Sequence, residues 1–190
     1  MNYRRMAATP VVGLIAALVM TGQSDRHAQH YTVYDLGPEG NPFSTGSDVN
    51  RWGVVVGSDT VSDQGASQSH AVLWYRDGLL DIKQIADARQ PGLLGPNSAG
   101  GVINDSGLVL LGGETLAQDP NNENFCGYGT GLQCVAMLWN KGILTPLPNP
   151  LGGTNTGFGW LNQNGEVTGW AENTVRDPQC LSAAPNGTGP

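Results

Sequence analysis

The residues whose spacing points most directly to chemistry are three cysteines, Cys126, Cys134 and Cys180. Cys126 and Cys134 are close together in a glycine-rich segment, so we expect them to form a disulfide bond in an oxidising compartment. Such a bond contributes roughly 2–3 kcal/mol by restricting the unfolded loop. Cys180 then pairs with a cysteine beyond Pro190, or it is a reactive or intermolecular thiol, because an odd count leaves one cysteine over.

Oxygen-bearing side chains gather in two segments that are candidates for cation binding, since hard cations prefer oxygen ligands. Neither segment has the residue order of an EF-hand loop. We therefore predict solvated loop polarity, no resident metal or cofactor, and at most a loosely bound calcium ion. The residues are Asp59 and Asp63 in one segment, and Asp119, Asn121, Asn122 and Glu123 in the other.

A catalytic constellation is not apparent. His70 precedes an apolar strand, where we expect an ordinary hydrogen bond, while His27 and His30 lie at the boundary of the N-terminal segment. No Ser-His-Asp spacing is present, so we assign no catalytic, cofactor-binding or metal residues. Of the tryptophans, Trp74 and Trp139 recur at one strand position and are predicted to be packing residues. The remaining three either pack or stack on a ligand: Trp52, Trp160 and Trp170.

The first 28 residues have the composition of an export signal with an uncertain cleavage site. Arg4 and Arg5 precede the uncharged run Val11 to Met20, which is too short to cross a bilayer of roughly 30 Å and fits a signal core. The alternative is a buried helix. Residues 31–190 carry six Lys and Arg against 15 Asp and Glu, a net charge of −9. We predict a secreted, periplasmic or extracellular protein with no membrane span after signal removal and no nucleic-acid partner.

A repeated turn motif organises the rest of the chain. Asparagine is followed three residues later by glycine in three copies, with spacings of 54 and 58 residues, and apolar stretches flank each copy. Asparagine hydrogen-bonds to the backbone of a turn and glycine adopts positive φ, so each copy predicts a hairpin. The predicted turn residues are Asn50, Gly53, Asn104, Gly107, Asn162 and Gly165.

A second hairpin follows in two of the copies. Ala71 to Tyr75 precedes Gly78 and the strand Leu79 to Ile82, and Ala136 to Trp139 precedes Gly142 and the strand Ile143 to Leu147. Each unit therefore has four short strands, the number in a propeller blade. We predict an all-β chain of tandem four-stranded antiparallel blades over residues 31–190, divided at about 31–82, 83–147 and 148–190. Because the last unit is incomplete, the chain is a fragment of a larger propeller-like protein or a short solenoid. Residues 31–36 are predicted to be a strand that completes the last blade.

Several of these motifs resemble the HAF-type extracellular repeat of bacterial secreted proteins. The resemblance covers about residues 31–170. It rests on Asp35-Leu36-Gly37, Val55 to Gly57, Ile103 to Gly107, and the Ala-x-Leu-Trp strands at Ala71 and Ala136. It implies secretion and a propeller-like architecture, and it implies no enzymatic activity.

These observations favour a non-enzymatic binding or structural module. The long loops 58–69, 113–133 and 170–190 would form one surface, because loops on a rigid β scaffold commonly carry recognition. Its ligand is unknown and is either a carbohydrate or a protein. The alternative is an extracellular, carbohydrate-active hydrolase or lyase whose site lies on loops or in missing blades. A cell-envelope repeat that acts only as a spacer is a third possibility.

Overall fold

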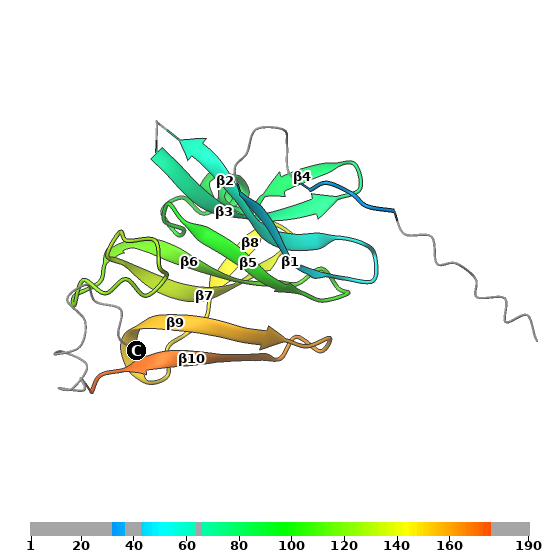
Figure 1. Ribbon diagram of the computed structural model, residues 1–190. Helices are drawn as coiled ribbons and strands as arrows, with labels where there is room; N and C mark the ends of the chain where they lie inside the picture. Colours follow the sequence, from blue (N-terminus) through cyan, green and yellow to red (C-terminus); the bar gives the residue numbers. More distant parts are fainter. Residues whose placement is uncertain (1–31, 37–42, 64–65, 176–190) are drawn as a thin grey trace, which may run out of the picture. The chain divides into compact units, whose positions relative to one another are not determined.

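The computed structural model describes residues 32–36, 43–63 and 66–175 of the chain. The chain divides into two units, Met1–Val33 and Tyr34–Pro190, and the secondary structure described below belongs to the second (Figure 1). The export signal and Cys180 lie outside the described residues. Within the described ranges, none of the helical structure is long and apolar enough to cross a membrane.

Among the described residues of the second unit, the strands form three antiparallel sheets, which confirms the predicted all-β class. The first sheet has the order β1-β2-β3-β4, the second has the order β5-β6-β7-β8, and the third pairs β9 with β10. Strands adjacent in a sheet are also consecutive in the chain, so hairpins join them. The strands are β1 (Ser44–Val49), β2 (Val55–Asp63), β3 (Ala66–Tyr75), β4 (Gly78–Asp81), β5 (Ser98–Ile103), β6 (Val109–Gln118), β7 (Leu132–Asn140), β8 (Ile143–Pro146), β9 (Gly152–Leu161) and β10 (Val167–Asn173).

The first hairpin of each sheet turns on an asparagine. Between β1 and β2, Asn50 Oδ1 accepts the backbone N–H of Trp52 and of Val54, each at 3.0 Å. Gly53 has a φ of 77°, a left-handed conformation that glycine adopts without a steric penalty. Asn104 and Asn162 bind the N–H groups two and four residues later in the same way.

The three turn asparagines form a ladder across the sheets. Asn50 Nδ2 donates to the carbonyl oxygen of Asn104 at 3.3 Å, and Asn104 Nδ2 donates to that of Asn162 at 3.2 Å. Equivalent residues of successive repeats therefore meet, and the sheets stack in a fixed register.

A second set of contacts runs beside this ladder. The backbone N–H of Arg51 donates to Asp105 Oδ1 at 2.9 Å, and the N–H of Asp105 donates to Gln163 Oε1 at 2.9 Å. The Arg51 guanidinium also contacts Asp105 at 2.8 Å. The hydrogen bonds from the Arg51 backbone and side chain lower the pKa of the Asp105 carboxyl.

The first strand of every sheet contains an irregularity three residues before the turn asparagine. The pairing register skips one residue there: Ser47 in β1, Gly101 in β5 and Gly159 in β9. Such bulges increase the local twist of a strand. At Gly101 the glycine is also needed for packing, because a Cβ atom would lie 2.1 Å from the ring of Phe158.

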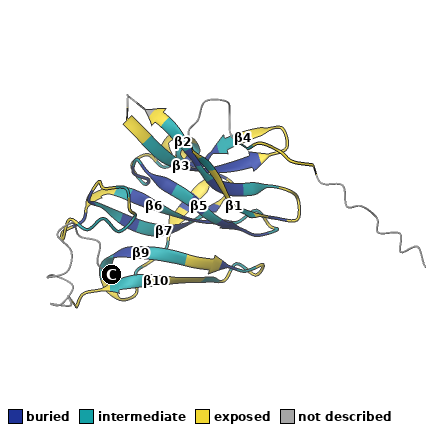
Figure 2. Ribbon diagram, viewed as in Figure 1, coloured by how far each residue is buried: buried dark blue, intermediate teal, exposed yellow. Residues whose placement is uncertain are grey.

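Two hydrophobic clusters lie between the sheets (Figure 2). We call the face of a sheet toward the preceding sheet its front and the face toward the following sheet its back. The first cluster joins Val56 and Leu73 on the back of the first sheet to Ile103 and Val109 on the front of the second. Full burial of one such side chain stabilises the fold by about 1.5–3 kcal/mol. The second cluster is smaller and contains buried Val102, Leu110 and Leu161.

A short helix, α1 (Ile82–Arg89), follows the first sheet. Sequence analysis extended the preceding strand to Ile82, but this residue begins the helix and is buried in the first cluster. Asp81 caps the helix by accepting the Gln84 N–H at 3.2 Å. Residues 32–36 form no strand in the described structure, so the predicted strand at this end is wrong for those residues.

Candidate functional site

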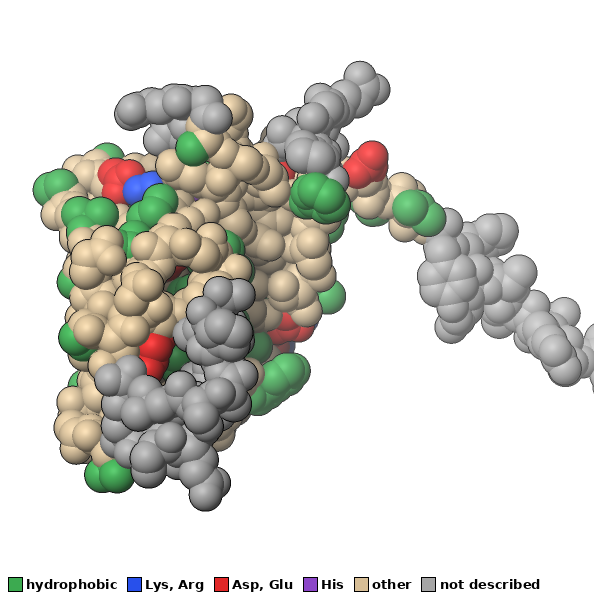
Figure 3. Space-filling view, turned by 60° about the vertical axis from the view of Figure 1, so that its left-hand side comes forward, with side chains coloured by type: hydrophobic (Ala, Val, Ile, Leu, Met, Phe, Trp, Pro, Cys, Tyr) green, Lys and Arg blue, Asp and Glu red, His purple; other side chains and the backbone are tan. Residues whose placement is uncertain are grey.

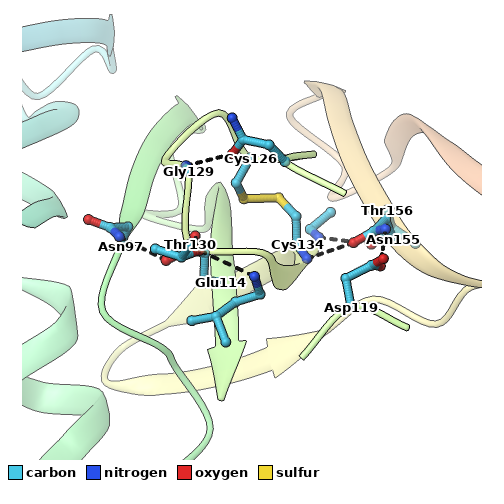
Figure 4. The surroundings of a disulfide bond; sticks show 12 residues. Asn97, Glu114, Asp119, Cys126, Gly129, Thr130, Cys134, Asn155 and Thr156 are labelled. Atoms are coloured by element: carbon cyan, nitrogen blue, oxygen red, sulfur yellow. Dashed lines mark hydrogen bonds between the residues drawn. A yellow bond between two sulfur atoms is a disulfide. The ribbon is translucent and has the colours of Figure 1, made fainter. Parts of the chain in front are cut away.

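A disulfide bond closes the loop between β6 and β7. Cys126 is bonded to Cys134, with their Cα atoms 5.4 Å apart and a sequence separation of 8 residues (Figure 4). This confirms the predicted pair, although Cys134 lies within β7 and not in the loop. We call residues 119–131 the disulfide loop. Three of its glycines have positive φ, which allows the chain to reverse within a short span: Gly127, Gly129 and Gly131.

The disulfide loop is fastened to the second sheet through a buried carboxylate. Glu114, in β6, is 1% exposed. Its Oε2 accepts Asn97 Nδ2 at 2.8 Å, and its Oε1 accepts the hydroxyl of Thr130 in the loop. These hydrogen bonds offset the large free-energy cost of burying a charged group.

The loop also reaches the first sheet. Tyr128 of the loop lies close to the side chain of Ser69 in β3. Burial raises the pKa of Tyr128, and the negative charge of Glu114 raises it further, while the nearby Ser69 side chain acts in the opposite direction. The end of the β2–β3 hairpin and the disulfide loop therefore meet at one end of the unit.

Asn97 and Ser98 cap the edge of β3, where β4 no longer pairs with it. Asn97 Oδ1 accepts the Ser69 N–H at 3.0 Å, and Ser98 Oγ accepts the Ala71 N–H at 2.9 Å. Because the pairing of β4 reaches only to Val72, these side chains provide acceptors that a longer strand would otherwise have supplied.

The next sheet repeats this cap. Asn155 Oδ1 accepts the Cys134 N–H at 2.8 Å, and Thr156 Oγ1 accepts the Ala136 N–H at 2.9 Å. Asn155 Nδ2 also contacts Glu172 Oε2 at 3.1 Å, as Asn97 does with its own glutamate. Sequence analysis missed this device. The sequence does contain a signal for it. In both sheets an Asn lies seven residues before the turn asparagine and is followed directly by Ser or Thr, and a Glu lies ten residues after the turn asparagine.

The capping residues of the third sheet lie beside a carboxylate cluster. One ligand oxygen from each of Asp119, Glu123 and Glu172 lies within 4.8 Å of the other two. Sequence analysis considered residues 119–123 as a candidate cation segment but predicted solvated loop polarity there, and the fold adds Glu172 from β10 to the group. Asn121 and Asn122 are exposed, and the N–H of Asn121 donates to Asp119 Oδ1 at 2.8 Å. The other predicted segment differs, because Asp59 is buried and accepts the Ser44 hydroxyl at 2.7 Å.

Asp119 is held as a carboxylate. Burial by itself raises its pKa, but hydrogen bonds from Asn155, the N–H groups of Glu123 and Asn121, and Thr154 outweigh burial and lower it. Its Oδ2 accepts Asn155 Nδ2 at 2.8 Å and the Thr154 hydroxyl at 3.0 Å. An acid that must donate a proton near neutral pH needs a raised pKa. The cluster is therefore suited to binding a hard cation or to holding the loop, and poorly suited to acid catalysis.

His70 and Asp81 form a buried pair. His70 Nδ1 lies 2.7 Å from Asp81 Oδ2, and His70 Nε2 lies 3.3 Å from Gln68 Oε1. Both side chains are less than a tenth exposed. Because Asp81 also caps α1, the pair ties β3 to the start of the helix.

The tryptophans divide into buried and exposed groups. Trp74 and Trp139 are buried, and within the described residues their ring N–H groups have no hydrogen-bond partner. Trp52, Trp160 and Trp170 are more than half exposed. Trp170 contacts Phe125 of the disulfide loop, with ring centroids 4.5 Å apart.

The end of the unit that carries the disulfide loop has little charge on its visible surface. Figure 3 looks toward this end, and most of the coloured surface is uncharged polar side chain and backbone, with scattered hydrophobic groups. The part of this surface that is visible therefore offers hydrogen bonds and small apolar contacts.

The fold and this site define the class of the protein as a tandem antiparallel β-sheet protein with a disulfide-closed loop. No family model matches the chain, and neither a curated protein nor a solved structure matches it.

Proposed function

We propose that this chain is an exported, non-enzymatic binding module whose recognition surface is the disulfide loop together with the end of the β2–β3 hairpin. The observation that carries the proposal is the way the loop is held. The disulfide bond closes it, Glu114 of the second sheet accepts a hydrogen bond from it, Ser69 of the first sheet lies close to its Tyr128, and its Phe125 contacts Trp170 of the third. A loop fixed in this way loses little conformational entropy when it binds a partner.

Export and a propeller-like arrangement are part of this proposal. The apolar segment Val11 to Met20 and the disulfide bond support export, since disulfides persist mainly in oxidising compartments. Four-stranded sheets stacked in register support a propeller-like arrangement and the resemblance to HAF-type repeats. The ligand we propose is a polysaccharide or the surface of an extracellular protein, because both can make hydrogen bonds and small apolar contacts with this end of the unit (Figure 3).

A hydrolase or lyase is the weaker proposal. It would use the carboxylates of Asp119 and Glu172, which are close enough to act together. However, Asn155 and Thr154 hydrogen-bond to both carboxylates, and the pKa of Asp119 is lowered. This arrangement favours a structural or cation-binding role for the pair.

The test is binding of the purified chain to an array of immobilised polysaccharides and extracellular matrix proteins, with and without calcium. A variant with both Cys126→Ser and Cys134→Ser opens the loop and is expected to lose at least tenfold in affinity for any probe that binds. The matched control is Arg76→Ala, an exposed change in the β3–β4 turn, which should bind normally. Cleavage of an arrayed polysaccharide that depends on Asp119 or Glu172 would overturn the non-enzymatic assignment.

A further inference from the structure

The back of the third sheet exposes residues at positions that contact the following sheet in the other two sheets. Two residues before the turn asparagine, Val102 is buried against the third sheet, and Asp48 accepts the N–H of Ile103 in the second sheet at 3.0 Å. The third sheet has Trp160 at this position, and it is 62% exposed. At this position the third sheet therefore presents a large apolar side chain to solvent.

A second back-face position shows the same difference. Six residues after the turn asparagine, Val56 and Leu110 are both fully buried beneath the following sheet. The third sheet has exposed Thr168 here. Close by, exposed Trp170 lies over Gly157, so an indole ring covers part of this face.

The front of the first sheet is the counterpart of this face. One residue before the turn asparagine, Ile103 and Leu161 are buried against the preceding sheet, whereas Val49 is 57% exposed. Val49 pairs with Val55, as Ile103 and Leu161 pair with the valines of their own neighbouring strands. The apolar pair Val49 and Val55 therefore lies on the front of the first sheet, at the position where the corresponding pairs of the second and third sheets pack against the preceding sheet.

The sizes of the facing residues are also complementary. Phe158 on the front of the third sheet packs over Gly101 and Gly112 on the back of the second. On the back of the third sheet, Trp170 occupies the position that Gly112 has in the second sheet. Because Trp170 is large, a sheet that packs on this face needs a small residue opposite it. The front of the first sheet has Gly46 at the position of Phe158, with the side chain of Leu36 beside it.

The asparagine ladder can continue across the same contact. The carbonyl oxygens of Asn104 and Asn162 each accept the N–H of their turn glycine and the Nδ2 of the preceding repeat. The Asn50 carbonyl accepts the Gly53 N–H in the same way. Asn162 Nδ2 instead donates to the exposed carboxylate of Glu166 in its own turn at 2.5 Å, a partner that the carbonyl oxygen of a further repeat would replace.

We propose that the back of the third sheet docks the front of the first sheet of a second copy of this chain, head to tail. Trp160, Thr168 and Trp170 form one side of the contact, and Val49, Val55 and Gly46 form the other. The contact repeats the interfaces within the chain, with Asn162 donating to the Asn50 carbonyl of the next copy. Because its two sides differ, the association is head to tail: it closes into a ring where the rotation between successive sheets brings the free faces together, and otherwise it extends to longer oligomers.

The test is the mass of the purified chain over a concentration series, measured by light scattering after the state of residues 1–28 is established by mass spectrometry. The wild-type chain is expected to form oligomers whose average mass rises with concentration. Val49→Lys and Trp160→Lys each place a charge in one side of the contact, so each variant alone is expected to stay at the mass of a single chain. Mixed together, the two variants should form a 1:1 dimer and nothing larger, because each retains the side that the other lacks.

The matched control is Leu116→Lys, since Leu116 is 63% exposed and lies on neither face of the contact. This variant should associate like the wild-type chain, and unchanged thermal melting establishes that all three variants fold. A wild-type chain that stays monomeric throughout the series overturns the proposal. Self-association of Val49→Lys but not of Trp160→Lys also overturns it, because that result indicates a symmetric back-to-back contact. Equal association of all variants places the contact elsewhere.

Discussion

Replacement of Asn104 by alanine tests how much the asparagine ladder contributes to the free energy of unfolding. Asn104 is 2% exposed. Its Oδ1 accepts the N–H groups of Ser106 and Leu108 at 3.1 and 3.0 Å, and its Nδ2 donates to the next sheet. A buried donor left without a partner costs about 1–3 kcal/mol, and an ordinary hydrogen bond contributes about 1 kcal/mol. Since Ser106 is exposed and water can reach its N–H, we expect a loss of about 2–3 kcal/mol in the free energy of unfolding.

Asn162 provides the matched comparison. It makes the same turn, but the N–H groups it binds are exposed, and water replaces the side chain when it is removed. Asn162→Ala should therefore lower the free energy of unfolding by less than about 1 kcal/mol. Asn104→Asp keeps the acceptor oxygens, but it buries a charge and places a carboxylate oxygen against the Asn162 carbonyl oxygen, so its loss should be at least that of Asn104→Ala.

Urea unfolding followed by tryptophan fluorescence and far-ultraviolet circular dichroism measures all three variants under one set of conditions. Equal losses for Asn104→Ala and Asn162→Ala would refute the reasoning, because the argument depends on burial. A loss below about 1 kcal/mol for Asn104→Ala would show that the inter-sheet rung contributes nothing measurable.

Two further predictions concern the disulfide loop. Reduction of the Cys126–Cys134 bond should lower the free energy of unfolding by about 2–3 kcal/mol, since the open loop gains conformational entropy in the unfolded chain; urea curves with and without reductant measure this, and identical curves would contradict it. The lowered pKa of Asp119 means that its contribution to stability is fully present above the ordinary aspartate value of 3.8 and is lost as pH falls through the lower value of the folded protein. Asp119→Asn should therefore flatten the acid limb of a plot of stability against pH, and an unchanged limb would show that Asp119 is not its source.

The hairpins could be predicted from the sequence because their causes are local. The hydrogen bonds of Asn50 to Trp52 and Val54 span four residues, and the positive φ of Gly53 is a property of one residue. Apolar stretches on either side then specify antiparallel strands. The same reasoning predicted the disulfide bond, because Cys126 and Cys134 are close in the chain.

Features that depend on pairing between distant residues could not be predicted in this way. Asp119 and Glu172 are far apart in sequence, and only the packing of the third sheet on the second brings them together. Glu114 had no predicted partner, yet Asn97 and Thr130 satisfy it from two different segments. The start of α1 at Ile82 was hidden because an isoleucine suits a strand or a buried helix equally well.

The sequence by itself determined which segments turn, which pair and which cysteines bond, since each of these depends on contacts within a few residues. Only the tertiary structure decided which faces of the sheets meet and which carboxylates share a site. Stacking places equivalent residues of successive repeats against one another. Val102 and Trp160 occupy equivalent positions in the second and third sheets, yet Val102 is buried and Trp160 is exposed. The environment of a side chain in a repeat protein depends on the neighbouring sheet, and that information is not contained in the segment that carries the side chain.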